Sequence, residues 1–244
     1  MPHFSIGRVL RSGLPIALAS VILGSCNMWY VVDPHFTTAT ISTAHKDVFV
    51  LAYSSRSGSV DVSAPSVNTD SNNRGAFWPA GQSPTRDGET CTRWKAEDHG
   101  TEVVANIQEG AALRVRTNRD GSVDAITVTR NVWFDGSWIF NVNMWHVTNT
   151  FDPGLTTVLG ANLHAVFGKV PRLPWDICAK VEGSKLSFVV WPSRQTRPAY
   201  GDVTHGGTVS LPSNEVYAGH FGNYVGHLAP GQSIDYDQMK VTTK

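Results

Sequence analysis

The sequence predicts an all-β protein built as an antiparallel sandwich or barrel. From residue 89 to the end of the chain, short runs rich in β-branched and aromatic residues alternate with turn residues. No window of about twelve residues has the apolar spacing of an amphipathic helix. After its N-terminal segment the chain keeps about 220 residues, a size at which sandwiches and barrels commonly form one undivided domain.

The expected strands follow one another along the chain with one long interruption. They cover residues 47–53, 90–94, 103–107, 112–116, 125–133, 138–146, 163–167, 177–181, 186–191, 208–211, 224–228 and 233–241. Residues 54–89 are rich in Ser, Asn, Gly and Pro, which indicates a long loop that is either functional or partly disordered. Part of this loop should be ordered, because it contains Phe77 and Trp78.

The N-terminus has the features of an export signal. Arg8 and Arg11 precede an uncharged apolar run, residues 14–23, which is too short to span a bilayer. The run ends in LGSC, residues 23–26, which resembles the bacterial lipoprotein box, and this resemblance implies cleavage before Cys26 and lipidation of its sulfur. The alternative is ordinary secretion after cleavage near ALA, residues 17–19.

These features predict three segments and an extracytoplasmic location. Residues 1–25 would be the signal peptide, residues 26–46 a spacer on a lipid anchor, and residues 47–244 a single β-sandwich domain. The spacer assignment rests on the Thr/Ser-rich residues 37–43. The mature protein would be lipid-anchored in the cell envelope or secreted, and no second apolar span follows that would hold it to a membrane.

The number of cysteines predicts how the thiols pair, and the net charge limits the classes of binding partner. With Cys26 lipidated, Cys91 and Cys178 remain as one pair, which we expect to form a disulfide in an oxidising compartment; two isolated buried thiols are the alternative. Removing residues 1–25 takes away two arginines and no acid, so that 18 basic residues face 20 acidic ones. A charge so close to zero argues against nucleic acid as a partner.

The stretch KVEGSKLSFVVWP, residues 180–192, predicts a hairpin with Gly183-Ser184 as a two-residue type II′ turn. One face of this hairpin is then entirely apolar and consists of Ile177, Ala179, Val181, Leu186, Phe188 and Val190. Trp191 lies on the opposite face with Lys180, Ser187 and Val189. Such a mixed face is partly solvated or covered by a loop.

Residues 125–145 predict a second hairpin. A two-residue Asp-Gly turn would set the apolar face of one strand against the polar face of the other, whereas a three-residue loop, residues 134–136, makes the faces agree. The apolar face then carries Ile126, Val128, Val132, Trp138, Phe140, Val142 and Met144, with Arg130 as the one exception. The polar face carries Thr127, Thr129, Asn131, Trp133, Ile139, Asn141, Asn143 and Trp145.

This polar face is the candidate ligand site. Amides and hydroxyls at alternate positions can bind sugar hydroxyls, and tryptophans offer flat surfaces to pyranose rings. The predicted contacts are Thr129, Asn131, Trp133, Asn141, Asn143 and Trp145, with Trp191 added if both hairpins share a sheet. The alternative is a half-exposed structural face covered by residues 54–89.

The C-terminal half resembles the concanavalin A-like lectin and glucanase superfamily, which includes the laminin G-like modules. The resemblance rests on the hairpin at 178–192, on GNYVGH at 222–227 and on SIDYDQMKV at 233–241. It implies an antiparallel jelly-roll β-sandwich of two stacked sheets, whose concave sheet often carries a glycan site. The clustered acids Glu-x-Asp-x-Glu of the glycan-cleaving members and the calcium loops of the legume-type lectins do not occur here.

Other chemistries find little support. The nine histidines lack zinc-site spacing, no Gly-x-Ser-x-Gly nucleophile elbow occurs, and no phosphate-binding loop precedes a helix. We therefore expect a non-catalytic glycan-binding protein without a cofactor or metal, held to the membrane through its lipid alone. The alternatives are a glycosidase or lyase that uses acids from distant segments, such as Asp135, Glu182 or Asp237, and a structural or protein-interaction lipoprotein.

Overall fold

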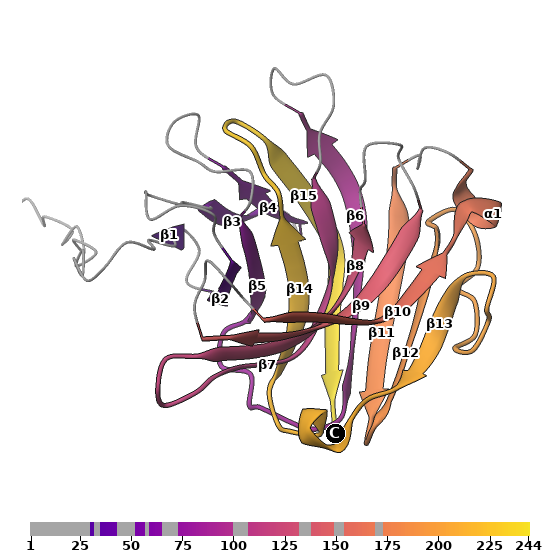
Figure 1. Cartoon of the computed structure of the whole chain (residues 1–244). Helices are drawn as coiled ribbons and strands as arrows, with labels where there is room; N and C mark the ends of the chain where they lie inside the picture. The colour runs from indigo at the N-terminus through magenta and orange to yellow at the C-terminus, as the bar shows by residue number, and fades with distance from the viewer. Residues whose placement is uncertain are drawn as a thin grey trace, which may run out of the picture.

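The computed structural model describes residues 30–31, 35–42, 52–56, 59–64, 73–99, 107–131, 138–148, 154–168 and 173–244, and these form two stacked β-sheets (Figure 1). The eight-stranded sheet has the order β1 (Tyr30–Val31), β3 (Ala52–Arg56), β4 (Ser59–Ser63), β15 (Ser233–Thr243), β6 (Gly88–Asp98), β11 (Trp175–Glu182), β12 (Lys185–Pro192) and β13 (Gly206–Ser210). The seven-stranded sheet has the order β10 (Leu155–Asn162), β9 (Ile139–Val147), β8 (Val123–Asn131), β7 (Gln108–Thr117), β14 (His220–Gly226), β5 (Arg74–Pro79) and β2 (Phe36–Ser42). All named pairs are antiparallel except β1 with β3. The predicted jelly-roll β-sandwich is confirmed.

Helical structure in the described residues is short: α1 (His164–Phe167) and the 3₁₀ turn η1 (Ser213–Glu215). Neither is long and apolar enough to cross a membrane. The expected export signal, Cys26, the residues 47–51 and 103–106, and Trp133 lie outside the described residues.

Both predicted hairpin registers are confirmed. In the β11–β12 hairpin Glu182 pairs with Lys185, and Gly183 has the positive φ of +55° that the first position of a type II′ turn requires. In the β8–β9 hairpin Asn131 pairs with Ile139 and Thr127 with Asn143, which is the register of a three-residue loop. The agreement of apolar faces therefore predicts the register better than the local Asp-Gly motif does.

The first hydrophobic core lies between the two sheets. Its residues include Ile126, Val128, Phe140 and Val142 from the seven-stranded sheet, and Ile177, Ala179, Phe188 and Val190 from the eight-stranded sheet. The exception Arg130 is also buried here, where its guanidinium lies 4.4 Å from the centre of the Trp94 ring and 5.4 Å from that of Trp138. Stacking on indole rings lets a cation occupy an otherwise apolar layer.

A second hydrophobic core lies on the concave face, which is the face of the seven-stranded sheet turned away from the eight-stranded sheet. It consists of Ala39, Ile41, Ala76, Trp78, Ala112, Val115, Val123, Ala125, Trp145, Val147 and Tyr224. In a flat sheet β2 would lie roughly 24 Å from β9, five strand spacings away. Here Cα atoms of β2 approach within 8 Å of β7, β8 and β9. The sheet is therefore rolled around this core.

Four expectations about secondary structure are corrected. Residues 36–42, expected in the spacer, form β2, because Ala39 and Ile41 are buried in the second core and the threonines suit an edge strand. The loop expected at 54–89 contains β4 and β5. Residues 164–167 form α1 and not a strand, and their Phe167 stacks on Trp138 with ring centres 5.0 Å apart. Strand β10 was not predicted, since its largely exposed side chains have no apolar alternation.

The predicted disulfide between Cys91 and Cys178 is confirmed, and it joins directly opposed residues of β6 and β11. It closes a segment with a sequence separation of 87 residues. A cross-link of this length restricts the unfolded chain and stabilises the folded one.

We expect reduction of this disulfide to lower the free energy of unfolding by about 2–4 kcal/mol. Urea unfolding of the chain with Cys26 replaced by Ser, with and without dithiothreitol, measures the difference. The matched control is the Cys91→Ser/Cys178→Ser double variant, whose unfolding midpoint should not respond to dithiothreitol. An unchanged midpoint on full reduction of the parent would contradict the prediction.

Candidate functional site

The polar side chains of the predicted site form a row across β10, β9 and β8 on the concave face. The Thr157 hydroxyl donates to Asn143 Oδ1 over 2.8 Å, and Asn143 Nδ2 donates to the Thr129 hydroxyl over 3.2 Å. One step along the strands, Trp145 Nε1 donates to the Thr127 hydroxyl over 2.9 Å. Each group thus binds a neighbour in the row.

The β8 end of this row is closed. Trp145 is 2 % exposed, Thr129 3 % and Asn143 6 %. Arg74 of β5 reaches across the rolled sheet until its guanidinium carbon lies 5.9 Å from the centre of the Trp145 ring. Strand β2 covers the face together with Arg74 and Trp78 of β5, which belong to residues 54–89, and a glycan has no access to the Trp145 ring in this conformation.

The β10 end of the row is open. Thr157 is exposed and Asn141 is half-buried. The exposed Gly160 lies opposite Asn141, where a Cβ would stand 3.4 Å from Asn141 Oδ1. Because glycine has no side chain, it leaves this amide uncovered. Asn131 occupies the last position of β8, and residues 132–137, which include Trp133, lie outside the described residues.

Trp191 lies far from this row, because the two predicted hairpins belong to different sheets. It is 7 % exposed and packs with Val189 and Cys178 on the outer face of the eight-stranded sheet. Tyr200, from the segment after β12, packs on the same cluster. The condition for adding Trp191 to the site is therefore not met, and it fills a small structural cluster.

Of the three candidate catalytic acids, Glu182 and Asp237 are described by the structure, and Glu182 is ion-paired. Glu182 Oε1 lies 2.8 Å from Lys244 Nζ, and its Oε2 lies 3.0 Å from Lys180 Nζ. Hydrogen bonds from these two lysines lower the pKa of Glu182 to about 2. Asp237 lies on β15, in the register of Arg93. Both acids belong to the eight-stranded sheet, while Asp135 lies outside the described residues.

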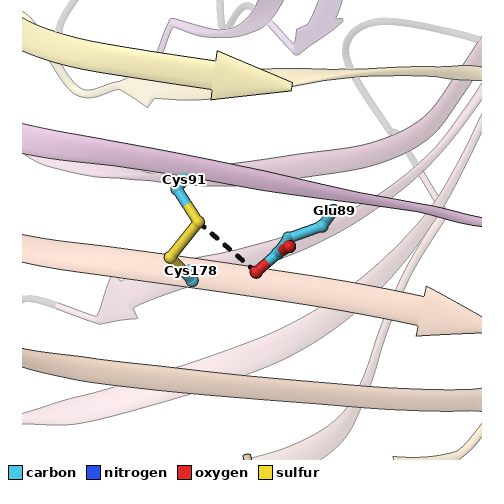
Figure 2. Close-up of side chains that lie close together, drawn as sticks. All are labelled: Glu89, Cys91 and Cys178. Atoms are coloured by element: carbon cyan, nitrogen blue, oxygen red, sulfur yellow. Dashed lines mark hydrogen bonds between the residues drawn. A yellow bond between two sulfur atoms is a disulfide. The ribbon is translucent and has the colours of Figure 1, made fainter. Parts of the chain in front are cut away.

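Glu89 lies beside the disulfide, with its Oε1 3.5 Å from Cys91 Sγ (Figure 2). Within the described part of the chain, Glu89, Cys91 and Cys178 are the group of His, Cys, Asp or Glu side chains spaced closely enough to share a metal ion. The disulfide, however, leaves neither sulfur as a thiolate, the form that binds metal. Arg197 and Tyr200 also bind the same oxygen of Glu89. The group therefore acts as a structural cluster.

The fold brings together two groups of charged residues that no sequence motif predicts. At one end of the first core, Glu109 is 1 % exposed and its Oε1 lies 3.8 Å from Arg130 Nε. Burial raises the pKa of Glu109 well above its ordinary value, against the opposing charge of Arg130. At the other end, His146 lies between Asp124 and Glu215. Alternation along the strands predicts the face of Asp124 and His146, but it does not predict the approach of Glu215.

The fold matches solved structures, while the sequence matches no protein-family model and no curated protein. The exoplasmic/lumenal domain of VIP36, solved in its Ca²⁺/Man3GlcNAc-bound form, is similar with a TM-score of 0.50 and 13 % identity over 86 % of each chain. The carbohydrate binding module CBM66 from Bacillus subtilis is similar with a TM-score of 0.47 and 8 % identity over 88 % of this chain and 100 % of that one. At 13 % identity, the likeness to the VIP36 domain shows a shared β-sandwich fold and nothing beyond the fold.

We expect Trp145→Ala to lower the free energy of unfolding by about 3–5 kcal/mol, because it removes a buried aromatic ring from the second core. Asn141→Ala, on the same strand and the same face but half-buried, should change it by only about 0.5 kcal/mol. Urea unfolding of both variants gives the comparison. Equal stability of the two would show that Trp145 is not part of a packed core.

Proposed function

We propose that the protein is a non-catalytic glycan-binding protein of the cell envelope, exported by its N-terminal segment and anchored through lipid on Cys26. The observation that carries the proposal is the open end of the polar row, where Asn141 and Thr157 face solvent on the concave side of a lectin-like sandwich. The site would be centred on these two residues, and we expect Trp133 to contribute to it.

The chemistry of this open end suits a polyol. The Asn141 amide offers a donor and an acceptor, and the Thr157 hydroxyl adds a second acceptor while it donates to Asn143. Asn143 lies behind Thr157, accepts its hydrogen bond and donates to Thr129, so it fixes the orientation of the Thr157 hydroxyl, as second-layer partners do in preorganised sites. Trp133 remains a predicted stacking partner, because it is the second residue after β8 in the sequence.

The distribution of acids supports binding without hydrolysis. Glycoside hydrolysis requires one carboxyl that is protonated and a second one across the scissile bond. Glu182 is a poor proton donor because its pKa is lowered to about 2, and it lies on the other sheet. We expect no release of labelled product when the protein is incubated with a glycan that it retains.

A structural or protein-interaction role is the second candidate, and the burial of Trp145 favours it. The concave face of the described strands is mostly filled by the protein's own side chains. In that case the open end would be a solvated sheet edge, and no glycan would be retained.

The mature chain from residue 27 should show saturable adsorption to at least one bacterial envelope or plant polysaccharide, with tryptophan fluorescence as the readout, with and without calcium. Asn141→Ala and Thr157→Val should each weaken this adsorption by roughly fivefold, the equivalent of one lost hydrogen bond. Thr156→Val is the matched control. This exposed threonine directly precedes Thr157 in the same strand, and its side chain points to the opposite face of the sheet.

Unchanged adsorption by both Asn141→Ala and Thr157→Val would exclude this end of the row as the site. Failure of the parent protein to bind any polysaccharide of the array would favour the structural candidate.

A further inference from the structure

His146 of β9 holds two carboxylates at once. Its Nδ1 lies 2.9 Å from Asp124 Oδ1, and its Nε2 lies 3.0 Å from Glu215 Oε1. A carboxylate oxygen only accepts hydrogen bonds, so both contacts are hydrogen bonds when both ring nitrogens carry a proton. The geometry therefore corresponds to the charged imidazolium.

The two carboxylates depend on His146 to different degrees. Asp124 Oδ2 also accepts from Arg116 Nε at 2.8 Å and from Asn118 Nδ2 at 2.9 Å. The Glu215 side chain is fully buried, its Oε1 accepts one further hydrogen bond, from Asn214, and its Oε2 has no hydrogen-bond partner in the described part of the chain. Among the described residues, His146 is the one cationic side chain that lies within 4.0 Å of the Glu215 carboxylate.

The bridge joins the seven-stranded sheet to a connection that comes from the other sheet. Glu215 ends η1, which lies between β13 of the eight-stranded sheet and β14 of the seven-stranded sheet. The backbone of this connection is held at three further points: Leu211 N donates to the Ser184 carbonyl, Arg114 Nη1 donates to the Glu215 carbonyl over 2.6 Å, and Gly219 exchanges backbone hydrogen bonds with Thr85. His146 supplies the link through the Glu215 side chain.

We propose that the Asp124–His146–Glu215 bridge is a pH-dependent latch that holds the 211–219 connection against the seven-stranded sheet. Loss of one proton from His146 leaves a nitrogen lone pair facing one of the two carboxylates, whichever nitrogen is deprotonated. An anion that faces a lone pair is unfavourable, above all at Glu215, whose side chain is fully buried, so the latch opens.

The charged surroundings favour the closed latch near neutral pH. The hydrogen bond to Asp124 raises the pKa of His146, and the charge of Glu215 adds to this against partial burial. Arg116 lies on the far side of Asp124, with its guanidinium carbon 3.9 Å from the centre of the Tyr217 ring. Arg114 is also close to Glu215, but it is directed at backbone carbonyls.

The direction of the pH dependence follows from the raised pKa of His146 and the lowered pKa of Asp124. The stabilisation from His146 is fully present below the pKa of an unfolded histidine, about 6.5, and it is lost as the pH rises through the raised folded-state pKa. Asp124 limits the acid side: although burial opposes it, hydrogen bonds from Asn118, His146 and Arg116 lower its pKa. Its contribution is present above the unfolded pKa of about 3.9 and is lost as the pH falls through the lowered one.

The test is the pH dependence of unfolding between pH 5.5 and 9 for the parent and for His146→Gln. As the pH rises across this range, the folding equilibrium constant of the parent should fall by a factor that is roughly two to five times larger than the factor for the variant. This is the effect expected for a half-exposed ion pair. Glu215→Gln should flatten the profile as well, because a neutral amide can pair with either form of the ring. His205→Gln is the control, since His205 pairs with Asp202 alone at 3.0 Å.

A second readout needs no variant. In an NMR titration of the parent, the amides of Val216 and Tyr217 should shift with the same midpoint as the His146 ring, and exchange of the Leu211 amide should accelerate above it. Parallel pH profiles for the parent and His146→Gln would overturn the latch. A His146 titration that leaves the amides of residues 211–217 unmoved would overturn it too.

Discussion

The rolled seven-stranded sheet is the constraint on which the other features depend, because it has to bury both of its faces. One face covers the core shared with the eight-stranded sheet, and the other encloses the second core around Trp78, Trp145 and Tyr224. The small residues Gly110, Ala112 and Gly222 line the floor of the roll, and a Cβ at Gly110 or Gly222 would lie within about 2 Å of a backbone oxygen, at 1.9 Å and 2.1 Å. Closing the roll with β2 removes large aromatic surface from water, and it also removes most of the concave face from contact with ligands.

Period-two alternation predicts what is local in this fold. Both hairpin registers follow from matching apolar faces, and the cysteine pair follows from the number of thiols left over. The position of β2 does not follow from such reasoning: Ala39 pairs with Ala76, and the intervening sequence gives no sign of that pairing. Strand β10 is missed for a different reason: it is a largely exposed edge strand, and its core contacts, from Val158, Leu159 and Ala161, do not alternate regularly along the sequence. Elements whose stability comes from distant partners therefore carry the weakest local pattern.

The candidate site shows the same division between local and long-range information. Alternation correctly places Thr129, Asn141, Asn143 and Trp145 on one face, but it does not distinguish polar groups that face solvent from polar groups that bind each other. The Thr157–Asn143–Thr129 chain satisfies its members internally, so Asn143 and Thr129 can be buried at little cost. Only their neighbours in space distinguish the two asparagines. Asn141 lies beside Gly160 near the sheet edge, whereas Asn143 lies under the rolled part of the sheet.

Hydrogen bonds compensate a buried cation at one end of the sandwich, whereas a buried carboxyl at the other end has none within the described part of the chain. At one end the Arg114 guanidinium, which is fully buried, donates to the carbonyls of Arg86, Gly183 and Glu215, so three loops share one cation. Such delocalised donors match several acceptors at once, and the burial of the charge is largely compensated. At the other end neither Glu109 oxygen has a hydrogen-bond partner among the described residues, and Arg130 Nε lies 3.8 Å from Oε1. Burial raises the pKa of this carboxyl, because it disfavours the charged form more than Arg130 favours it. The loop connections are thus fixed by satisfied charges at the Arg114 end, whereas the Glu109 end depends mainly on the aromatic packing of Trp94, Trp138 and Trp175.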